Sequence, residues 1–154
     1  MEKRLPYYHG CFGCGIDNPC GVELSFTYDG EKVYATYTPK EVHVGFKGLV
    51  HGGVVTALLD EAMWWAVAAA KRENTFTTRI TVEFKRPVRH GESYRVEGWM
   101  VEERRGRVFL VEGQVLDESG KMCAKGSGTF LKAPEEVMSM LLEGLSDPSL
   151  FTSE

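Results

Sequence analysis

Apolar residues run almost without interruption from Val54 to Ala70. The run contains neither Gly nor Pro and is long enough for about four to five helical turns, so it predicts a single helix. A helix that is apolar on every side is normally surrounded by other structure. Asp60 and Glu61 are its only charged residues. Because burial disfavours an ionised carboxylate, each acid needs a partner, an opening to solvent or a function.

Apolar and polar residues alternate with a period of two on both sides of this helix, which predicts strands. Before the helix, residues 22–28 and 33–37 predict a hairpin that turns at Asp29 and Gly30. After it, residues 74–86, 94–102, 108–116 and 121–131 predict four strands. Short turns join these strands, so we expect consecutive strands to be antiparallel neighbours.

The two ends of the chain have different patterns. Residues 1–20 are rich in Gly, Pro, Tyr and Cys and predict a loop that covers other structure. Residues 134–145 predict a short C-terminal helix, with Pro134 in its first turn. We therefore expect one domain over residues 1–154. Its α+β architecture is a long central helix wrapped by a curved antiparallel sheet of about six strands.

Composition excludes several classes of protein. The chain is 43% hydrophobic and 26% charged, as is usual for a soluble globular protein. Its formal net charge of −4 argues against nucleic acid or an anionic membrane as the main partner. The first ten residues lack the apolar segment of a signal peptide, and the acids in the long helix argue against a membrane span. We expect a cytoplasmic location.

Four cysteines raise the question of a metal. Cys11 and Cys14 have the two-residue spacing of a zinc knuckle, and His9 and Cys20 would complete four ligands. No second pair with this spacing exists, because the remaining cysteine is Cys123. Reduced, packed thiols explain the pattern as well, and we favour that explanation. We expect no metal and no cofactor, although metal binding by Cys11, Cys14 and Cys20 stays open.

The start of the long helix is a candidate binding site. His51, Gly52 and Gly53 precede the apolar run, and the glycines let the backbone approach a ligand closely. The first helical N–H groups have no internal partner and attract negative charge, including an oxyanion that develops in a reaction. Gly52 and Asp60 are eight residues apart, about 12 Å along one helix. Two copies packed antiparallel about a two-fold axis would bring them together, so we expect a site shared between subunits.

Three motifs resemble those of the HGG group of hotdog-fold thioesterases, which includes phenylacetate-pathway and THEM-type acyl-CoA thioesterases. They are Cys11-x-Gly-Cys14-Gly-x-x-Asn18-Pro-x-Gly21, Gly48-x-x-His51-Gly52-Gly53 with an acid nine residues after the His, and Phe84-Lys85-Arg86-Pro87. The resemblance extends over residues 11–131. It implies a hotdog fold, hydrolysis of acyl-CoA to free acid and CoA, and homodimers that often pair into tetramers.

The resemblance also implies roles for single residues. Asp60 falls on the catalytic acid of the family, and Gly52 on the amide of the oxyanion hole. Thr77 falls on a hydroxyl residue that would hold Asp60 or the attacking water. Some members have an Asn six residues before the His, where this chain has Gly45, so a mechanism that needs that amide is not expected here. Asp60 would act as a general base or as a nucleophile, and the sequence does not separate the two.

Other candidates have ordinary explanations beside the functional one. His51 and Gly53 adjoin the proposed oxyanion site, and for His51 we favour a ring that bonds the backbone. We expect Glu61 to pair with a cation or to face solvent. Arg86 and Arg89 lie near the strand end and would hold CoA phosphates, although basic residues there are usually just solvated.

Two other functions compete with hydrolysis. The first is a noncatalytic module that binds acyl-CoA or an acyl carrier, in which Asp60 only supports the dimer. The second is a dehydratase of the same fold, which is less favoured because that chemistry usually pairs a His with the acid across the site. The sequence leaves open the acyl group and the choice between dimer and tetramer.

Overall fold

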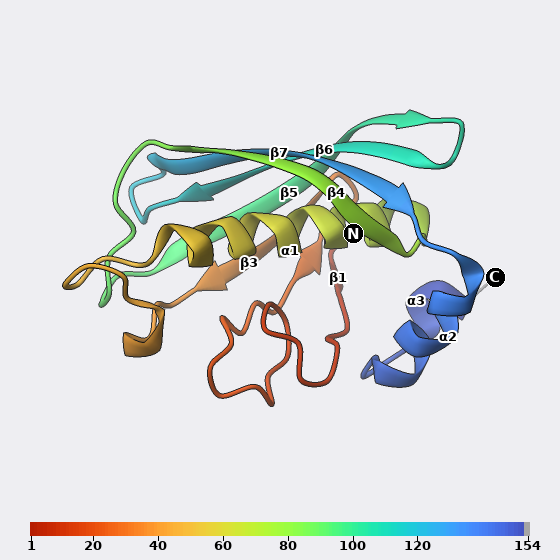
Figure 1. Cartoon of the computed structure of the whole chain (residues 1–154), viewed down its shortest axis with the longest axis horizontal. Coiled ribbons are helices and arrows are strands. Elements are labelled where there is room, and N and C mark those ends of the chain that lie inside the picture. Colours follow the sequence, from red (N-terminus) through yellow and green to blue (C-terminus); the bar gives the residue numbers. More distant parts are fainter. Residues whose placement is uncertain (153–154) are drawn as a thin grey trace.

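A computed structural model describes residues 1–152, and residues 153–154 of the predicted domain lie outside the described part. One long helix, α1 (Gly52–Lys71), lies against a seven-stranded antiparallel sheet, as Figure 1 shows. The sheet order is β1-β2-β3-β5-β6-β7-β4. The strands are β1 (Lys3–Arg4), β2 (Thr27–Tyr28), β3 (Lys32–Tyr37), β4 (Thr75–Phe84), β5 (Tyr94–Arg104), β6 (Val108–Leu116) and β7 (Met122–Lys132). This arrangement is the expected hotdog architecture, with two-residue strands β1 and β2 raising the strand number from about six to seven.

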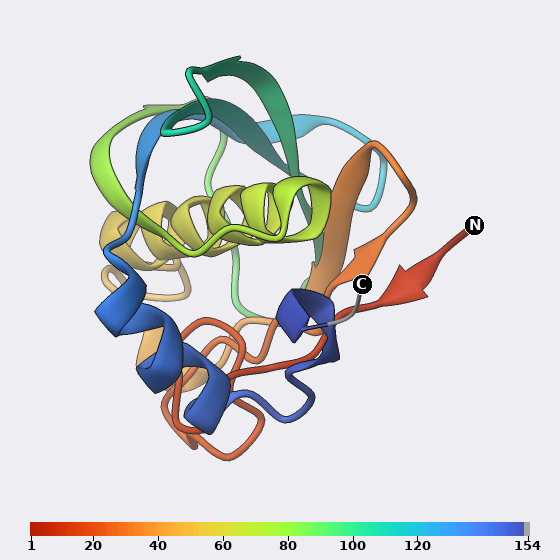
Figure 2. The same cartoon turned by 90° about the vertical axis from the view of Figure 1, so that its right-hand side faces the viewer.

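The remaining elements are short. A 3₁₀ turn, η1 (Glu41–His43), precedes α1, while α2 (Glu135–Gly144) and α3 (Ser149–Thr152) follow the last strand. The predicted C-terminal helix is thus confirmed, and α3 was not foreseen. In the end-on view of Figure 2, the sheet covers one side of α1, the N-terminal loops lie on the other side, and α2 lies beside them.

Both ends of α1 are explained by local chemistry. The His51 ring caps the helix, because its Nδ1 accepts a hydrogen bond of 2.8 Å from the Gly53 N–H. Arg72 ends it in the left-handed region at φ 56°, and its N–H donates to the carbonyl oxygen of Ala68. The helix is long and apolar enough to cross a membrane by length and composition alone, but its apolar side chains, such as Leu58, pack into the core of this domain.

Close packing of α1 on the sheet depends on glycines in the central strands. Gly98 of β5, Gly113 of β6 and Gly126 of β7 all face the helix. A Cβ on Gly98 would lie 2.5 Å from the carbonyl oxygen of Ala62, which is closer than any real contact. The backbone of α1 therefore lies directly on β5, and large side chains such as Leu59 fill the space beside the glycines.

The order of strands in the sheet corrects one prediction. We expected β4 and β5 to be antiparallel neighbours, but β4 pairs with β7, and β5 pairs with β3 and β6. The 85–93 connection does not close a hairpin. It bonds instead to the segment before α1, through the Val50 N–H to the Val88 carbonyl and the His90 N–H to the Gly48 carbonyl. This leaves β4 at the edge of the sheet.

The predicted N-terminal hairpin is only partly correct. Val22, Leu24 and Phe26 alternate toward the core as expected, and the turn at Asp29 is present, with its carboxylate accepting from the Glu31 and Lys32 N–H groups. The ladder to β3, however, covers only β2. Residues before β2 bond to the N-terminal loop instead, for example through the Leu24 N–H to the Gly13 carbonyl.

Replacing Gly98 tests the close approach of α1 to the sheet. Gly98→Ala should lower the free energy of unfolding by about 1–3 kcal/mol, because the new methyl group overlaps helix backbone that has little freedom to move. Denaturant unfolding measures this change. Ser127→Ala on β7, whose side chain is exposed, is the matched control and should change it by less than about 0.5 kcal/mol. Equal stabilities of the two variants would contradict the proposed packing.

Candidate active site

Asp60 lies in the middle of α1, beside the edge strand β4, and it is partly exposed. The hydroxyl of Thr77, on β4, donates a hydrogen bond of 2.7 Å to Asp60 Oδ1. Within residues 1–152, no salt bridge joins Asp60 to a cation. The carboxylate is therefore oriented by a neutral donor and stays available to a substrate or a water molecule.

A bulge in β4 decides which of two neighbouring threonines reaches Asp60. The pairing of β4 with β7 shifts register between Thr77 and Arg79. The Thr78 hydroxyl donates to the carbonyl oxygen of Thr129 at 2.9 Å, on the neighbouring strand, while Thr77 points to α1. Bulges commonly redirect side chains next to functional sites.

The start of α1 leaves one amide without a partner. The carbonyl oxygen of His51 accepts from Val54 and Val55, and the His51 ring takes the Gly53 N–H. This ring contact is the backbone-bonding role that we favoured for His51. Among the described residues, no acceptor bonds the Gly52 N–H. A helix N-terminus with such an amide is suited to bind an oxyanion.

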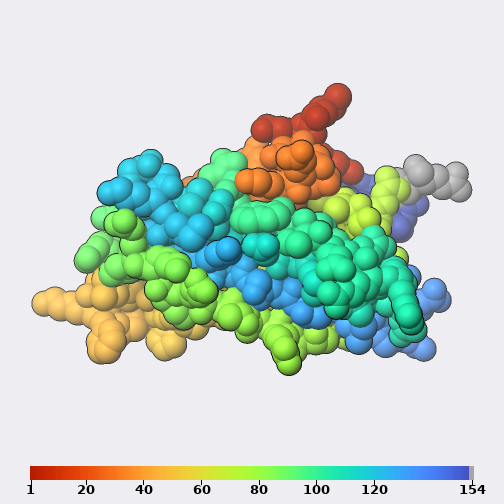
Figure 3. Space-filling model, turned by 90° about the horizontal axis from the view of Figure 1, so that it is seen from above, coloured from red at the N-terminus to blue at the C-terminus, as the bar shows by residue number. Residues whose placement is uncertain are grey.

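The Gly52 end of the helix opens into a pocket of about 750 Å³. The pocket lies between the 45–52 segment and the 84–88 segment, and Figure 3 shows the 40–50 loop projecting at one end of the molecule. Of the predicted residues, Gly45, His51, Gly52 and Arg86 line it, whereas Arg89 does not. A Cβ on Gly45 would lie 3.1 Å from the Cα of His51, so an Asn there would crowd the cap of α1.

Asp60 lines a different pocket, of about 180 Å³, together with Cys11, Glu61 and Trp64. In one chain, therefore, Asp60 and Gly52 do not face a common space, as their separation of about 12 Å along α1 requires. Strand β4 runs past both of them. Thr77 bonds Asp60, and the Phe84 ring lies against Gly52, 3.5 Å from where its Cβ would be.

Glu61 corrects another prediction. We expected it to pair with a cation or to face solvent, but it faces the N-terminal loop, where its Oε1 lies 3.6 Å from Cys11 Sγ and accepts from Trp65 Nε1 at 3.0 Å. Burial, with the neighbouring Cys11, raises the pKa of Glu61 to about 8. A hydrogen bond from the Cys14 thiol, helped by the backbone N–H groups of Cys14 and Gly13, lowers the pKa of the Cys11 thiol to about 5. The same hydrogen bond, together with burial, raises the pKa of Cys14.

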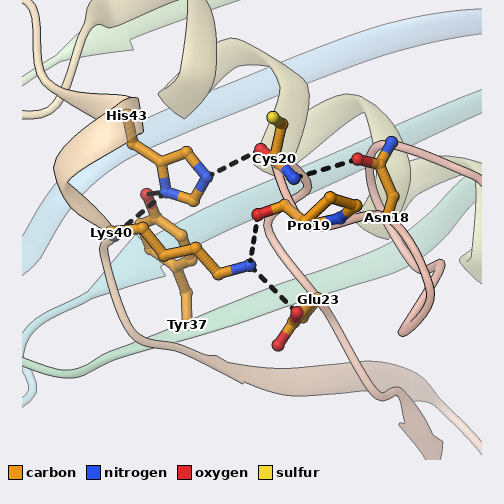
Figure 4. Close-up of polar contacts among 7 residues, drawn as sticks. All are labelled: Asn18, Pro19, Cys20, Glu23, Tyr37, Lys40 and His43. Atoms are coloured by element: carbon orange, nitrogen blue, oxygen red, sulfur yellow. Dashed lines mark hydrogen bonds and ion pairs between the residues drawn. The ribbon is translucent and has the colours of Figure 1, made fainter.

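The four zinc ligands considered from the sequence do not come together. His9 bonds Asp17, with 3.3 Å between Nδ1 and Oδ2. Cys20 is exposed. Figure 4 shows that the Cys20 carbonyl oxygen bonds His43 Nε2 and that the Cys20 N–H donates to Asn18 Oδ1. The His43 ring in turn bonds the Tyr37 hydroxyl. Glu61, which was not considered as a ligand from the sequence, lies beside Cys11 and Cys14 instead. The sequence feature that is consistent with this contact is Gly13, between the two cysteines. A Cβ on Gly13 would lie 2.3 Å from the Glu61 carboxyl carbon, so only glycine leaves room for Glu61 there.

The family described as the thioesterase superfamily matches residues 47–124, a range that contains Gly52, Asp60 and Thr77. Among curated protein sequences, none matches the chain.

Several solved structures share its fold. A thioesterase superfamily protein superposes with a TM-score of 0.72 at 24% identity, over 80% of this chain and 60% of its own length. Thioesterase superfamily member 2 of zebrafish has a TM-score of 0.68 at 18% identity, over 79% of this chain and 88% of its own. A Streptococcus mutans protein bound to acetyl-CoA has a TM-score of 0.62 at 17% identity, over 69% of this chain and 84% of its own. The chain thus spans less than two thirds of the first of these proteins.

Proposed function

The chain belongs to the thioesterase superfamily, and we propose that it hydrolyses acyl-CoA thioesters to free acid and CoA at a site shared by two subunits. The observation that carries the proposal is the Asp60 carboxylate, oriented by the Thr77 hydroxyl at 2.7 Å and joined to no cation in residues 1–152. Asp60 is partly exposed and has one neutral donor, so its carboxylate is open to a substrate or a water molecule. The acetyl-CoA in the similar Streptococcus mutans protein supports the choice of substrate class.

The reaction needs a base and a donor for the oxyanion. Asp60 of one subunit takes a proton from water as the water oxygen attacks the thioester carbonyl, or attacks the carbonyl itself. The Gly52 N–H of the other subunit stabilises the negative charge on the carbonyl oxygen. In the general-base route the carbon–sulfur bond then breaks, and CoA leaves as a thiol with the proton that Asp60 took from water. In the nucleophilic route CoA leaves as a thiolate and takes its proton from the water molecule that hydrolyses the acyl–Asp60 anhydride, which yields the free acid and regenerates the carboxylate. An oxyanion donor of this kind supplies about 3 kcal/mol.

The exposed outer edge of strand β4 is an argument for a second subunit. Among the described strands it pairs only with β7, and Phe76 and Phe84 on it are 49% and 58% exposed. A long edge strand with exposed aromatic residues is normally covered. If β4 of two copies pairs antiparallel with Thr77 opposite Phe84, the two-fold axis passes between Ile80 and Thr81. Because Thr77 touches Asp60 and Phe84 touches Gly52, this register brings Asp60 of one copy to Gly52 of the other.

The pocket at Gly52 offers cations for the CoA phosphates. Lys85 and Arg86 line it. Lys85 forms an ion pair of 2.9 Å with Glu83, whereas no carboxylate in residues 1–152 forms a salt bridge with Arg86. We propose Arg86 as the phosphate ligand, because its fork of donors fits a phosphate and is not committed to an acid. A dimer of dimers and a cytoplasmic location belong to the same proposal.

A panel of acyl-CoAs of different chain length and aromatic character tests the activity. The wild-type chain should release free CoA thiol, and Asp60→Asn should lower kcat/KM at least about 100-fold, because it removes the base. Glu31→Gln, at an exposed acid of the β2–β3 turn that lines neither of the two pockets, is the control and should leave the rate unchanged. Binding of acyl-CoA without thiol release by the wild type would favour the noncatalytic module.

Gly52 allows a direct test of a backbone amide. It is the first residue of α1, where Pro is tolerated, and His51 before it has φ −59° and ψ 137°, a conformation that Pro accepts in the preceding residue. Gly52→Pro removes the N–H and adds the proline ring, and it should lower kcat about 100- to 1,000-fold. Gly52→Ala keeps the N–H and meets Phe84 at an ordinary 3.5 Å, so it should retain most activity. Equal activity of the two variants would remove Gly52 from the mechanism.

Mixed dimers test whether the site is shared. Asp60→Asn dimers and Gly52→Pro dimers should each be inactive. A hybrid dimer has one intact site, which combines Asp60 of the Gly52→Pro chain with Gly52 of the Asp60→Asn chain. Random reassociation of equal amounts should restore about a quarter of wild-type activity. Mixing Asp60→Asn with Thr77→Val provides the control. Asp60 and Thr77 of one site come from the same chain, so each site of this hybrid carries one of the two changes and no activity should be recovered. No recovery in the first mixture would show that the two residues do not act across an interface.

A further inference from the structure

Cys11, Cys14 and Glu61 form a compact cluster where the N-terminal loop crosses the middle of α1. One ligand atom from each, two sulfurs and a carboxylate oxygen, lies within 4.8 Å of the other two. Cys14 is 2% exposed, and Cys11 and Glu61 are half-buried. The proposed hydrolysis uses none of these three groups.

The spacing fits one tetrahedral ion. Zinc binds sulfur at about 2.3 Å and carboxylate oxygen at about 2.0 Å, so two such ligands lie about 3.5 Å apart at a tetrahedral angle. The observed separation between Cys11 Sγ and Glu61 Oε1 is 3.6 Å. Two sulfurs on the same ion lie about 3.8 Å apart, within the range of the cluster. Only small side-chain adjustments would be needed.

The surroundings of the cluster are those of a thiolate site. The N–H groups of Gly13 and Cys14 point to Cys11 Sγ at 3.3 and 3.5 Å, and the Tyr8 N–H points to Cys14 Sγ at 3.3 Å. Backbone donors of this kind stabilise negative sulfur. Trp65 Nε1 holds the Glu61 carboxylate at 3.0 Å, as an outer-shell donor orients a metal ligand.

The cluster lacks a positive charge of its own. No salt bridge in the described part of the chain joins Glu61 to Lys, Arg or His. A thiol is a weak donor, so a cation among the two sulfurs and the carboxylate would stabilise the cluster more than the Cys11–Glu61 contact of 3.6 Å does. Soft sulfur ligands with one carboxylate select zinc over magnesium or calcium.

We propose that Cys11, Cys14 and Glu61 bind one zinc ion, which fastens the N-terminal loop to α1 next to Asp60. The protons that the two thiols and the Glu61 carboxyl group hold pass to solvent as the ion binds, so that all three ligands are ionised. A water molecule takes the fourth position from the adjoining pocket of about 180 Å³, which all three ligands line. The ion thereby sets the shape of the pocket into which Asp60 opens. This inference does not depend on the proposed hydrolysis, because it is read from metal content rather than activity.

Metal analysis of the full chain is the first measurement. Protein purified under reducing conditions without a metal-affinity tag or chelator, and then supplied with zinc and dialysed, should hold one zinc ion per chain. Cys11→Ser and Cys14→Ser should hold less than about a tenth of that. The matched control is Cys20→Ser, an exposed cysteine of the same loop, which should keep the full amount. A wild-type chain that binds no zinc, or equal loss in Cys20→Ser, would overturn the proposal.

The acid and its donor give a graded test. Glu61→Gln should weaken zinc binding by more than about 10-fold, and Trp65→Phe, which removes only the outer-shell hydrogen bond, by about 10-fold. Competition with a chromogenic chelator measures both. Unchanged affinity in Glu61→Gln would exclude the carboxylate as a ligand.

A third measurement needs no substitution and so does not depend on whether the variants fold. Zinc should slow alkylation of Cys11 and Cys14 by iodoacetamide at least about 10-fold, and leave Cys20 unchanged, when the labelled peptides are compared by mass spectrometry. A chelator should restore the original rates. Equal labelling of Cys11 and Cys14 with and without zinc would refute the site.

Discussion

The close contact between α1 and the sheet is the constraint on which the rest of the structure depends. Glycines at the same level of β5, β6 and β7 remove the side chains that would separate them. The helix backbone can then lie on the strands, while Leu59 and Met63 fill the space on either side. Because this contact fixes the rotation of α1, it also fixes which of its residues face away from the sheet. Glu61 is one of those residues, and Asp60 lies at the border, beside the edge strand β4.

The two acids are adjacent in sequence but face different surroundings. They differ by about 100° around the helix axis, so one points to β4 and the other to the N-terminal loop. Asp60 has one neutral donor, Thr77, and an open side. Glu61 lies among two thiols and an indole N–H. One helical step therefore separates a carboxylate suited to proton transfer from one suited to ligation.

A single chain does not bring together the two groups that the proposed reaction uses. The Gly52 amide and the Asp60 carboxylate open into separate pockets, and the strand that touches both is an unpaired edge. Among the described residues α1 is the one long helix, so under the proposed function a second copy of that helix is the simplest source of the missing partner. The proposed dimer would cover the exposed phenyl rings of β4.

Much of the architecture follows from the sequence because it depends on neighbours along the chain. The apolar run predicts α1, the alternation predicts the later strands, and the spacing of Gly52 and Asp60 excludes their meeting within one helix. Other features depend on which distant segments pack together. These are the pairing of β4 with β7, the bulge that turns Thr77 rather than Thr78 toward Asp60, and the position of Glu61 beside Cys11 and Cys14. Local periodicity carries no information about them, since the free energy that selects them comes from long-range packing and hydrogen bonds.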